Sequence, residues 1–257
     1  MSRRSSGAEA HLPRPWYVDG FGEHYLELYA HRNEREAELA LALLERSGRL
    51  RPGERLLDLA CGAGRHLAGL GRRQLRAVGL DLSEPLLKAA RGRLRPGLAL
   101  VRGDMRRLPF AAASFDGALS MFTSFGYFRE DAENWQVFAE LARVLRPGGW
   151  LFFDFLNRSA LPGQMAERGE RRGEHWIAEE ERRIEGERIV KRVTVRPRTG
   201  EGEALRYEES VRLFAPAELS AALAGRGFRE RERWGDYHGG PYAPQSARFI
   251  LLVEREG

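Results

Sequence analysis

The sequence predicts an α/β fold with a doubly wound, mostly parallel seven-stranded sheet and an antiparallel β insertion after the fifth strand. From residue 55 to 157, short apolar runs alternate with amphipathic helical patterns across short connections, which is typical of parallel sheets. That rhythm then stops, and strand-like runs separated by glycine-rich turns follow before it resumes near residue 215. We expect a flexible N-terminal arm over 1–16 and one domain over 17–257, with 157–214 as the insertion.

The first elements follow from apolar spacing and turn residues. Residues 17–47 predict a helix that ends near Gly48. Its expected apolar face consists of Leu26, Tyr29, Leu39, Leu43 and Leu44. A turn at Pro52 and Gly53 then leads into a strand over 55–59, and a helix over 65–71 comes next.

The alternation continues through the next two strands and the helix between them. The run "RAVGLDLS" predicts a strand that ends at Asp81. Ser83 is placed to cap the following helix, which has Pro85 in its first turn. A third strand ends near Asp104, and a fourth spans about 116–121.

The remaining elements bracket the insertion. An amphipathic helix over 131–145 is ended by "RPGG", and the fifth strand, 150–157, is apolar throughout, as in a strand covered on both faces. Inside the insertion, the strand-like runs are 175–183, 188–196 and 204–214. After it come a helix closed by Gly225 or Gly227 and strands over 229–237 and 247–256.

Composition narrows the class of protein. The chain has 257 residues, 42% of them hydrophobic, which suits a globular domain with a real core. Cys61 is the single cysteine, so no disulfide forms within the chain, and a reducing compartment is expected. The sequence has neither an apolar run of about 18 residues nor a signal-peptide pattern, so we predict a cytoplasmic protein without a membrane span.

The net charge of +5 raises the possibility of a nucleic-acid partner. Arginine alternates with glutamate along the chain, however, as in "AERGERRGEHW" and "RERER". Such alternation favours a solvated, ion-paired surface over a dedicated nucleic-acid patch.

The seam between the first strand and the next helix, "LDLACGAG", is built for close approach of a ligand. Ligands of parallel sheets bind beyond the carboxyl ends of the strands, and the start of a helix offers unpaired N–H groups. The third glycine of the dinucleotide pattern is absent, which disfavours a dehydrogenase, and the Gly-Lys-Ser/Thr of a phosphate-binding loop is absent too. Asp58 would repel a pyrophosphate and attract a cationic ligand.

Acidic residues also end the second and third strands. Asp81 is placed to accept hydrogen bonds from two ribose hydroxyls. Asp104 is placed to accept from an exocyclic amine, and Met105 to lie against an adenine face. A molecule with adenine, ribose and a positively charged amino-acid end fits this set, and S-adenosylmethionine is such a molecule.

The motifs "LLDLACGAG", "VGLDLS", "VRGDMRRLPF", "FDGALSMF" and "VLRPGGWLFFDF" resemble, in order and spacing, those of class I S-adenosylmethionine-dependent methyltransferases. The segment "SMFTSFGYF" also resembles small-molecule methyltransferases, including sugar N-methyltransferases. Ala60 departs from the pattern, which most often has glycine there. The cofactor-binding set that the resemblance implies is Tyr25, Tyr29, Arg32, Asp58, Ala60, Cys61, Gly62, Gly64, His66, Asp81, Leu82, Asp104, Met105 and Met121.

Within that set, the resemblance gives each group of residues a part of the cofactor. Asp58 and the turn residues would hold the methionine end, Asp81 the ribose, and Asp104 with Met105 the adenine. Arg32, on the helix expected to cover the cofactor, would either pair with its carboxylate or lie on the solvated surface.

Methyl transfer from a sulfonium chiefly needs alignment, so we predict no metal and no nucleophilic side chain. If a base is used, the candidates are Tyr127, Tyr237 and His238. Cys61, in the cofactor turn, is a poor candidate for covalent catalysis.

The leading hypothesis is therefore methyl transfer to nitrogen or oxygen of a small-molecule acceptor. A nucleic-acid methyltransferase is disfavoured because "SMFTSF" has no proline after the fourth strand. A non-catalytic, S-adenosylmethionine-binding regulatory protein is the third hypothesis. The insertion is expected to be a lid or, alternatively, a dimerisation surface. The sequence leaves the acceptor open, as well as the choice between monomer and homodimer.

Overall fold

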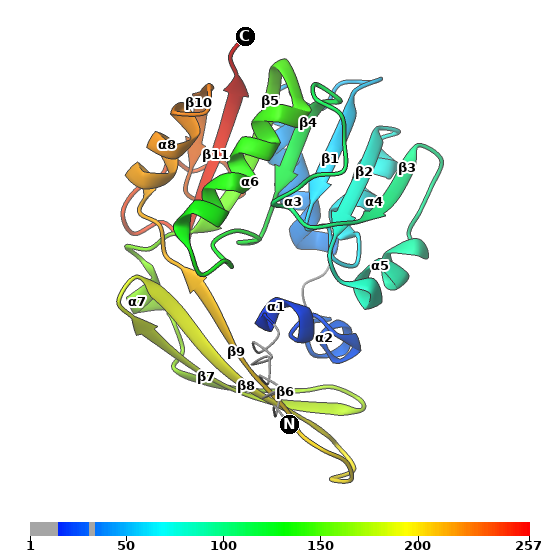
Figure 1. The fold of residues 1–257 in the computed structure, drawn as a ribbon, viewed down its shortest axis with the longest axis vertical. Coiled ribbons are helices and arrows are strands. Elements are labelled where there is room, and N and C mark those ends of the chain that lie inside the picture. The colour runs from blue at the N-terminus through cyan, green and yellow to red at the C-terminus, as the bar shows by residue number, and fades with distance from the viewer. Residues whose placement is uncertain (1–14, 31–33) are drawn as a thin grey trace, which may run out of the picture.

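The computed structural model describes residues 15–30 and 34–257. It has a main sheet flanked by helices and a second, smaller sheet at one end, with two short N-terminal helices between the sheets (Figure 1). Of the predicted N-terminal arm, residues 1–14 lie outside the described residues, and Trp16 already begins a helix.

Within the described residues, the main sheet has seven strands in the order β10-β11-β5-β4-β1-β2-β3. Its strands are β1 (Arg55–Leu59), β2 (Arg76–Asp81), β3 (Leu98–Arg102), β4 (Phe115–Ser120), β5 (Leu145–Leu156), β10 (Phe228–Trp234) and β11 (Arg248–Arg255). Only the pairs made by β11 are antiparallel. The predicted mostly parallel sheet is confirmed. Its order reverses between β1 and β4, which is the topological switch point.

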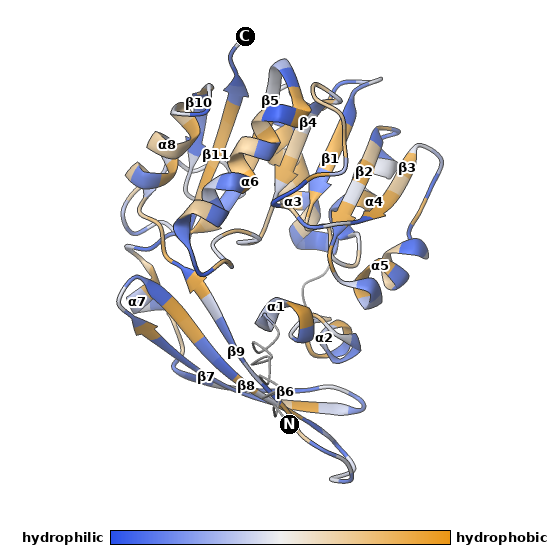
Figure 2. Ribbon diagram, viewed as in Figure 1, coloured by the Kyte–Doolittle hydropathy of each residue, from blue (hydrophilic) through white to orange (hydrophobic). Residues whose placement is uncertain are grey.

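Helices cover both faces of the main sheet because its central strands send apolar side chains into a core on each side. Figure 2 shows these strands coloured largely as hydrophobic. Alternate residues of one strand enter opposite cores: Phe153 packs with α6 (Asp131–Val144) and α8 (Pro216–Ala224), whereas Phe152 packs with α3 (Glu34–Arg46) and α4 (Arg65–Arg72). The remaining helix of this layer, α5 (Glu84–Arg91), packs against β3 and is capped by Ser83, as predicted. The Arg-Pro-Gly-Gly segment was expected to separate the helix from the fifth strand. It belongs instead to β5, which begins at Leu145 directly after α6.

The single helix predicted over residues 17–47 is wrong. The described residues there form α1 (Trp16–Asp19), α2 (Glu23–Leu28) and α3. The segments serve different layers: α3 packs on α4, whereas α2 packs on the second sheet. Leu39 is exposed, because the buried face of α3 follows Ala37, Ala40, Leu41 and Leu44.

The second sheet confirms the predicted antiparallel insertion and adds a strand. Among the described residues it has four strands: β6 (Arg168–Arg172), β7 (Trp176–Glu185), β8 (Arg188–Pro197) and β9 (Leu205–Arg212), preceded by α7 (Leu161–Gln164). The sequence analysis missed β6, because "RGERR" has no apolar side chain to signal a strand. On the inner face, Val193 and Val195 pack against Leu28 and Tyr29, which forms a separate small core.

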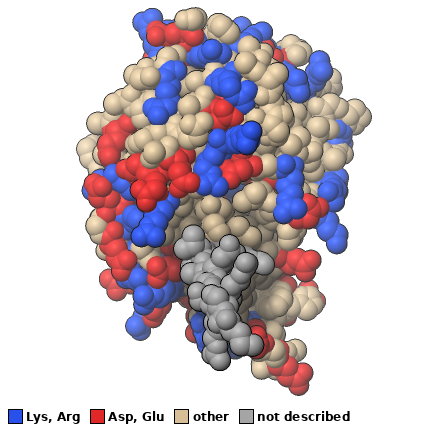
Figure 3. All heavy atoms as spheres, in the orientation of Figure 1, with Lys and Arg blue, Asp and Glu red and all other residues tan. Residues whose placement is uncertain are grey.

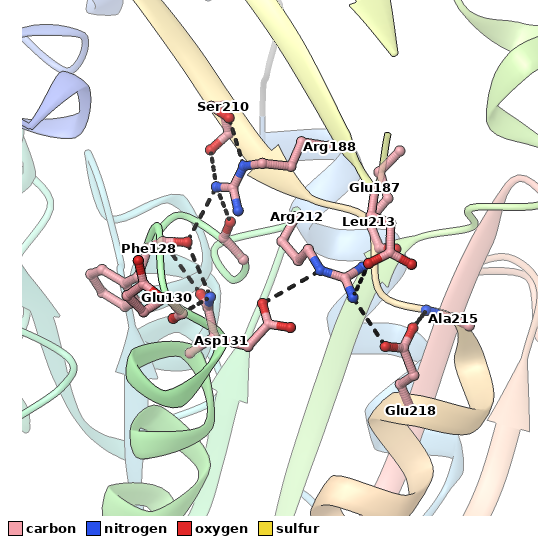
Figure 4. Close-up of polar contacts among 12 residues, drawn as sticks. Phe128, Glu130, Asp131, Glu187, Arg188, Ser210, Arg212, Leu213, Ala215 and Glu218 are labelled. Atoms are coloured by element: carbon pink, nitrogen blue, oxygen red, sulfur yellow. Dashed lines mark hydrogen bonds and ion pairs between the residues drawn. The ribbon is translucent and has the colours of Figure 1, made fainter. Parts of the chain in front are cut away.

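Two arginines fasten the second sheet to the loop between β4 and α6 (Figure 4). Arg188 Nη2 donates to the Phe128 carbonyl at 3.2 Å, and the Arg212 amide donates to the Gly126 carbonyl at 2.8 Å. The buried Arg212 guanidinium also pairs with Glu187, Glu218 and Asp131 at 2.7, 3.2 and 3.4 Å. The loop carrying Tyr127 is therefore held by backbone as well as side-chain contacts.

Replacing Gly126 should loosen this junction. Gly126 has φ +83°, and an added Cβ would lie 2.8 Å from the Arg212 carbonyl oxygen. We expect Gly126→Ala to lower the free energy of unfolding by about 2–4 kcal/mol, measured by urea denaturation. The control is Gly163→Ala, where an added Cβ meets nothing within 4 Å, so equal effects of the two variants would contradict the expectation.

Candidate functional site

A cavity of about 520 Å³ lies at the carboxyl ends of β1, β2 and β4, beneath α2. We call it the first cavity. Of the predicted cofactor-binding residues, it brings together Tyr25, Tyr29, Ala60, Cys61, Gly62, His66, Asp81, Leu82, Asp104, Met105 and Met121. Residues that the sequence analysis missed also line it, including Tyr17, Phe21, Arg65 and Phe122. Arg32 lies outside the described residues.

The turn between β1 and α4 forms one wall of the first cavity. Ala60, Gly62 and Gly64 all have left-handed backbone, with φ of 55°, 54° and 76°. The Gly62 amide donates to Asp81 Oδ2 at 2.8 Å, so the turn is tied to the end of the neighbouring strand. Gly64 precedes α4 and lies behind the lining, against Ala90. The small residues thus bring the backbone itself to the cavity surface.

Asp81 combines a structural contact with a polar face toward the first cavity. Its Oδ1 accepts from the Ser83 amide at 2.8 Å, and burial raises the pKa of its carboxyl. A carboxylate oxygen has two lone pairs, so each oxygen can accept a second hydrogen bond. Asp81 can therefore accept hydrogen bonds from a ligand in the first cavity while it orders the turn.

Asp104 is placed at the first cavity as predicted, but it has a partner that the sequence analysis missed. Arg106 Nη2 lies 2.6 Å from Asp104 Oδ2, and Arg106 also pairs with Glu133. Burial alone would raise the pKa of Asp104, but the Arg106 hydrogen bonds hold it below its usual value. Asp104 therefore stays ionised as a hydrogen-bond acceptor.

Asp58 and His66 are buried near the turn. Asp58 lies behind the described lining of the first cavity, and its Oδ2 has no hydrogen-bond partner among the described residues. Burial raises the pKa of Asp58 to about 7, against the opposing pull of Arg65. Burial lowers the pKa of His66 to about 3, so its ring is neutral near pH 7. A cationic ligand would favour the ionised form of Asp58.

A second cavity of about 590 Å³ lies between the first cavity and the second sheet. Its lining includes Leu161 and Met165 from the α7 region and Ile189 and Lys191 from β8. Within the described lining, the residues common to both cavities are Phe21, Tyr25, Tyr29, Phe122 and Tyr127. The two cavities therefore adjoin across a wall of aromatic side chains.

Tyr29 links this aromatic wall to the second sheet. Its ring stacks on Tyr25 with 4.5 Å between centroids, and its hydroxyl donates to the buried carboxylate of Glu180 on β7. Lys191 Nζ donates to the same hydroxyl at 2.9 Å. Hydrogen bonds of the Tyr29 hydroxyl thus connect the aromatic wall to the second sheet.

The three residues predicted as candidate bases lie in different parts of the structure. Tyr127 lies at both cavities, against Trp16 and Phe21. Tyr237 and His238 belong to neither described lining, so the structure does not bring these two predicted bases to the cavities. Their loop folds back on α3, where Arg46 donates to both of their carbonyls at 3.3 Å. The buried Tyr237 hydroxyl donates to Asp154 at 2.5 Å, and burial with the Asp154 charge raises its pKa well above 10.

The structure also reveals why Asp154 interrupts the apolar run of β5. Its carboxylate is fully buried and accepts from the Phe122 amide at 2.8 Å and from Arg248 Nε at 2.7 Å. These bonds hold Phe122 in left-handed backbone, with φ 55°. The Arg65 guanidinium lies 3.7 Å from the centroid of the Phe122 ring. The charge in "FFDFL" is a signal that the sequence analysis passed over.

Fold and cavity together define a doubly wound α/β protein with its ligand site at the switch point of a parallel sheet. Residues 56–149 match the family described as "Methyltransferase domain". The dTDP-3-amino-3,4,6-trideoxy-alpha-D-glucopyranose N,N-dimethyltransferase of Streptomyces venezuelae is 32% identical over 196 residues, which cover 68% of this chain and 75% of that protein. The chain belongs to the class I S-adenosylmethionine-dependent methyltransferase family.

Other comparisons are narrower or lower in identity. A demethylmenaquinone methyltransferase of Beutenbergia cavernae is 44% identical over 101 residues, so the match spans 39% of this chain and about two fifths (40%) of that protein. The structure of SAM-bound CalS10, an amino pentose methyltransferase from Micromonospora echinaspora, superposes with a TM-score of 0.63 at 25% identity. That superposition covers 88% of this chain and 95% of CalS10.

Ala60 stands where the family pattern most often has glycine, and its left-handed backbone is strained for alanine. We expect Ala60→Gly to raise the free energy of unfolding by about 0.5–1 kcal/mol, measured by urea denaturation. Ala63 lies in the same turn and has no positive φ. As a control, Ala63→Gly should therefore lower the free energy of unfolding by up to about 1 kcal/mol. A loss of stability in Ala60→Gly would show that the turn is unstrained.

Proposed function

We propose that this protein transfers a methyl group from S-adenosylmethionine to nitrogen or oxygen of a small-molecule acceptor. The observation that supports this most directly is the pair of adjoining cavities, which meet across shared aromatic side chains at the switch point. The first cavity is the cofactor site, and the second is the acceptor site.

The first cavity suits S-adenosylmethionine chemically. The left-handed turn leaves room for the methionine end against bare backbone, and the unpartnered Oδ2 of Asp58 supplies negative charge behind it. Asp81 would hold the ribose, and Asp104 with Met105 would hold the adenine; all three line this cavity. When bound, S-adenosylmethionine supplies an electrophilic methyl group whose bond to sulfur breaks as the acceptor forms its new bond.

The chain itself aligns the acceptor and keeps water away. Phe21, Tyr25 and Phe122 present apolar surface to both cavities, and the second sheet closes the acceptor side as a lid. Such positioning lowers a barrier by roughly 7–11 kcal/mol at most. The Tyr127 side chain, at both cavities, is the candidate that would accept a proton from a protonated acceptor.

A small-molecule acceptor suits the second cavity better than a nucleic acid. Its volume of about 590 Å³ is in the range of small-molecule pockets. Figure 3 shows acidic and basic side chains interspersed across the face in view, without a continuous basic track there. The Streptomyces venezuelae relative, an N,N-dimethyltransferase of an amino sugar by its name, favours nitrogen as the acceptor atom. The open second cavity also disfavours a purely regulatory, non-catalytic role.

Asp81 provides the test of this function. Asp81→Asn keeps the shape of the side chain and removes its charge, so we expect S-adenosylmethionine to bind about 10–100-fold more weakly by isothermal titration calorimetry. Glu84→Gln removes the same charge from an exposed position nearby and should leave the affinity unchanged. Wild-type affinity in Asp81→Asn would refute the ribose assignment, and a wild-type protein that does not bind S-adenosylmethionine would refute the function.

Asp58 predicts a pH dependence of cofactor binding. With a pKa of about 7, its carboxyl is protonated in much of the free protein at pH 6 and ionised at pH 8. A cationic ligand prefers the ionised form, so affinity for S-adenosylmethionine should rise about fivefold to tenfold between these pH values. Asp58→Asn should remove this rise in the same titration. An unchanged pH profile in Asp58→Asn would assign the effect to the ligand's own amino group.

A further inference from the structure

The inner face of the second sheet, turned toward the second cavity, carries a row of charged side chains. Arg182 on β7 is in direct register with Lys191 on β8, and Lys191 with Glu209 on β9. All three line the second cavity, and so does Arg171 on the edge strand β6. Because side chains alternate along a strand, Arg192 next to Lys191 points to the opposite face, where its side chain is 63% exposed.

A buried carboxylate holds the cations of this row in place. Glu180 is almost fully buried, and it pairs with Arg182, with Arg171 Nε at 3.2 Å and with Lys191 Nζ at 3.6 Å. Burial alone would raise the pKa of Glu180, but Lys191, Tyr29, Arg182 and Arg171 lower it to about 2. Glu180 is therefore ionised at neutral pH and anchors the three cations from behind the described cavity lining.

Among the residues that line the second cavity, cationic side chains outnumber carboxylates. Like charges directly opposite in a sheet, such as Arg182 and Lys191, destabilise it unless anions lie near. In the described lining, Arg248 adds a further cation on the main-sheet side, and its partner Asp154 is fully buried. The carboxylates that do line the cavity are engaged: Glu209 with Lys191 at 2.7 Å and Glu36 with Arg65 at 3.3 Å.

Apolar side chains line much of the rest of the second cavity, so this part suits an uncharged portion of the acceptor. Leu156, Leu161, Met165, Ile189 and Val211 line it, and the aromatic side chains shared with the first cavity border the side where methyl transfer would occur. An acceptor that fills this space would place its reactive atom at the aromatic wall and a polar group at the charged row.

We propose that the methyl acceptor carries an anionic group, a phosphate or a carboxylate, which Arg171, Arg182 and Lys191 bind at the inner face of the second sheet. The inference rests on the proposed function and adds a substrate class to it. Guanidinium groups recognise these anions through paired N–H donors. Among the described residues, the Arg182 guanidinium donates to Glu180 and to the Ala166 carbonyl, which leaves further N–H groups for a ligand.

The test is calorimetric titration of the full chain saturated with S-adenosylhomocysteine. Inorganic pyrophosphate and succinate serve as separate probes, so that the preferred anion is identified. We expect at least one probe to bind the wild-type protein and to bind Arg182→Gln at least tenfold more weakly. Arg192→Gln removes the same charge from the opposite face of the sheet and should bind like wild type. Lys191→Gln is a second variant, for use if Arg182→Gln does not fold.

Two separate binding measurements distinguish a wrong substrate class from a wrong proposed function. S-adenosylhomocysteine binding is measured first, and its absence in the wild-type protein would overturn the function. If that binding is intact, three results overturn the substrate class alone. These are no binding of either anion, equal loss in Arg182→Gln and Arg192→Gln, or a preference for a cationic probe such as spermidine.

Discussion

The hydrogen bond from the Gly62 amide to Asp81 joins the two features on which the site depends. One is a turn of left-handed residues between β1 and α4, and the other is the acidic end of β2. Parallel pairing of β1 with β2 brings the carboxyl ends of both strands to one edge, so the turn and the carboxylate meet without a long connection. The same carboxylate orders the backbone and presents oxygens to the first cavity. A ligand thus meets a wall that is organised before it arrives, which lowers the cost of ordering on binding.

The second sheet extends this site in a direction that the main sheet does not supply. It rests on α2 through Leu28 and Tyr29 and is fastened to the loop after β4 by Arg188 and Arg212. Both attachments lead to residues that line the cavities: α2 carries Tyr25, and the loop carries Tyr127. The shape of the acceptor side and the placement of the aromatic wall are therefore coupled through the same contacts.

The sequence predicted the parts of the fold that local chemistry controls. The strand ends at Asp81 and the Ser83 cap agree with the structure, because apolar periodicity and capping act over a few residues. Asp81 and Asp104 line one cavity because parallel pairing aligns the carboxyl ends of β2 and β3. The edge strand β6 was missed for the opposite reason, since an edge strand of arginine, glycine and glutamate lacks apolar alternation. The position of Tyr237 and His238, on α3 and away from both described cavity linings, was not predicted because the direction in which a loop folds is not encoded in its composition.

By itself, then, the sequence determined the doubly wound sheet, the small-residue turn and the acidic strand ends, since each depends on neighbours in the chain or on the regular pairing of parallel strands. Only the tertiary structure decided which residues share the acceptor side. Tyr29 and Glu180 are separated by 151 positions and meet because the second sheet packs on α2. Asp154 reads as an interruption of an apolar strand until Arg248 and the Phe122 amide are seen around it. Contacts of this kind depend on packing between layers, which no local pattern records.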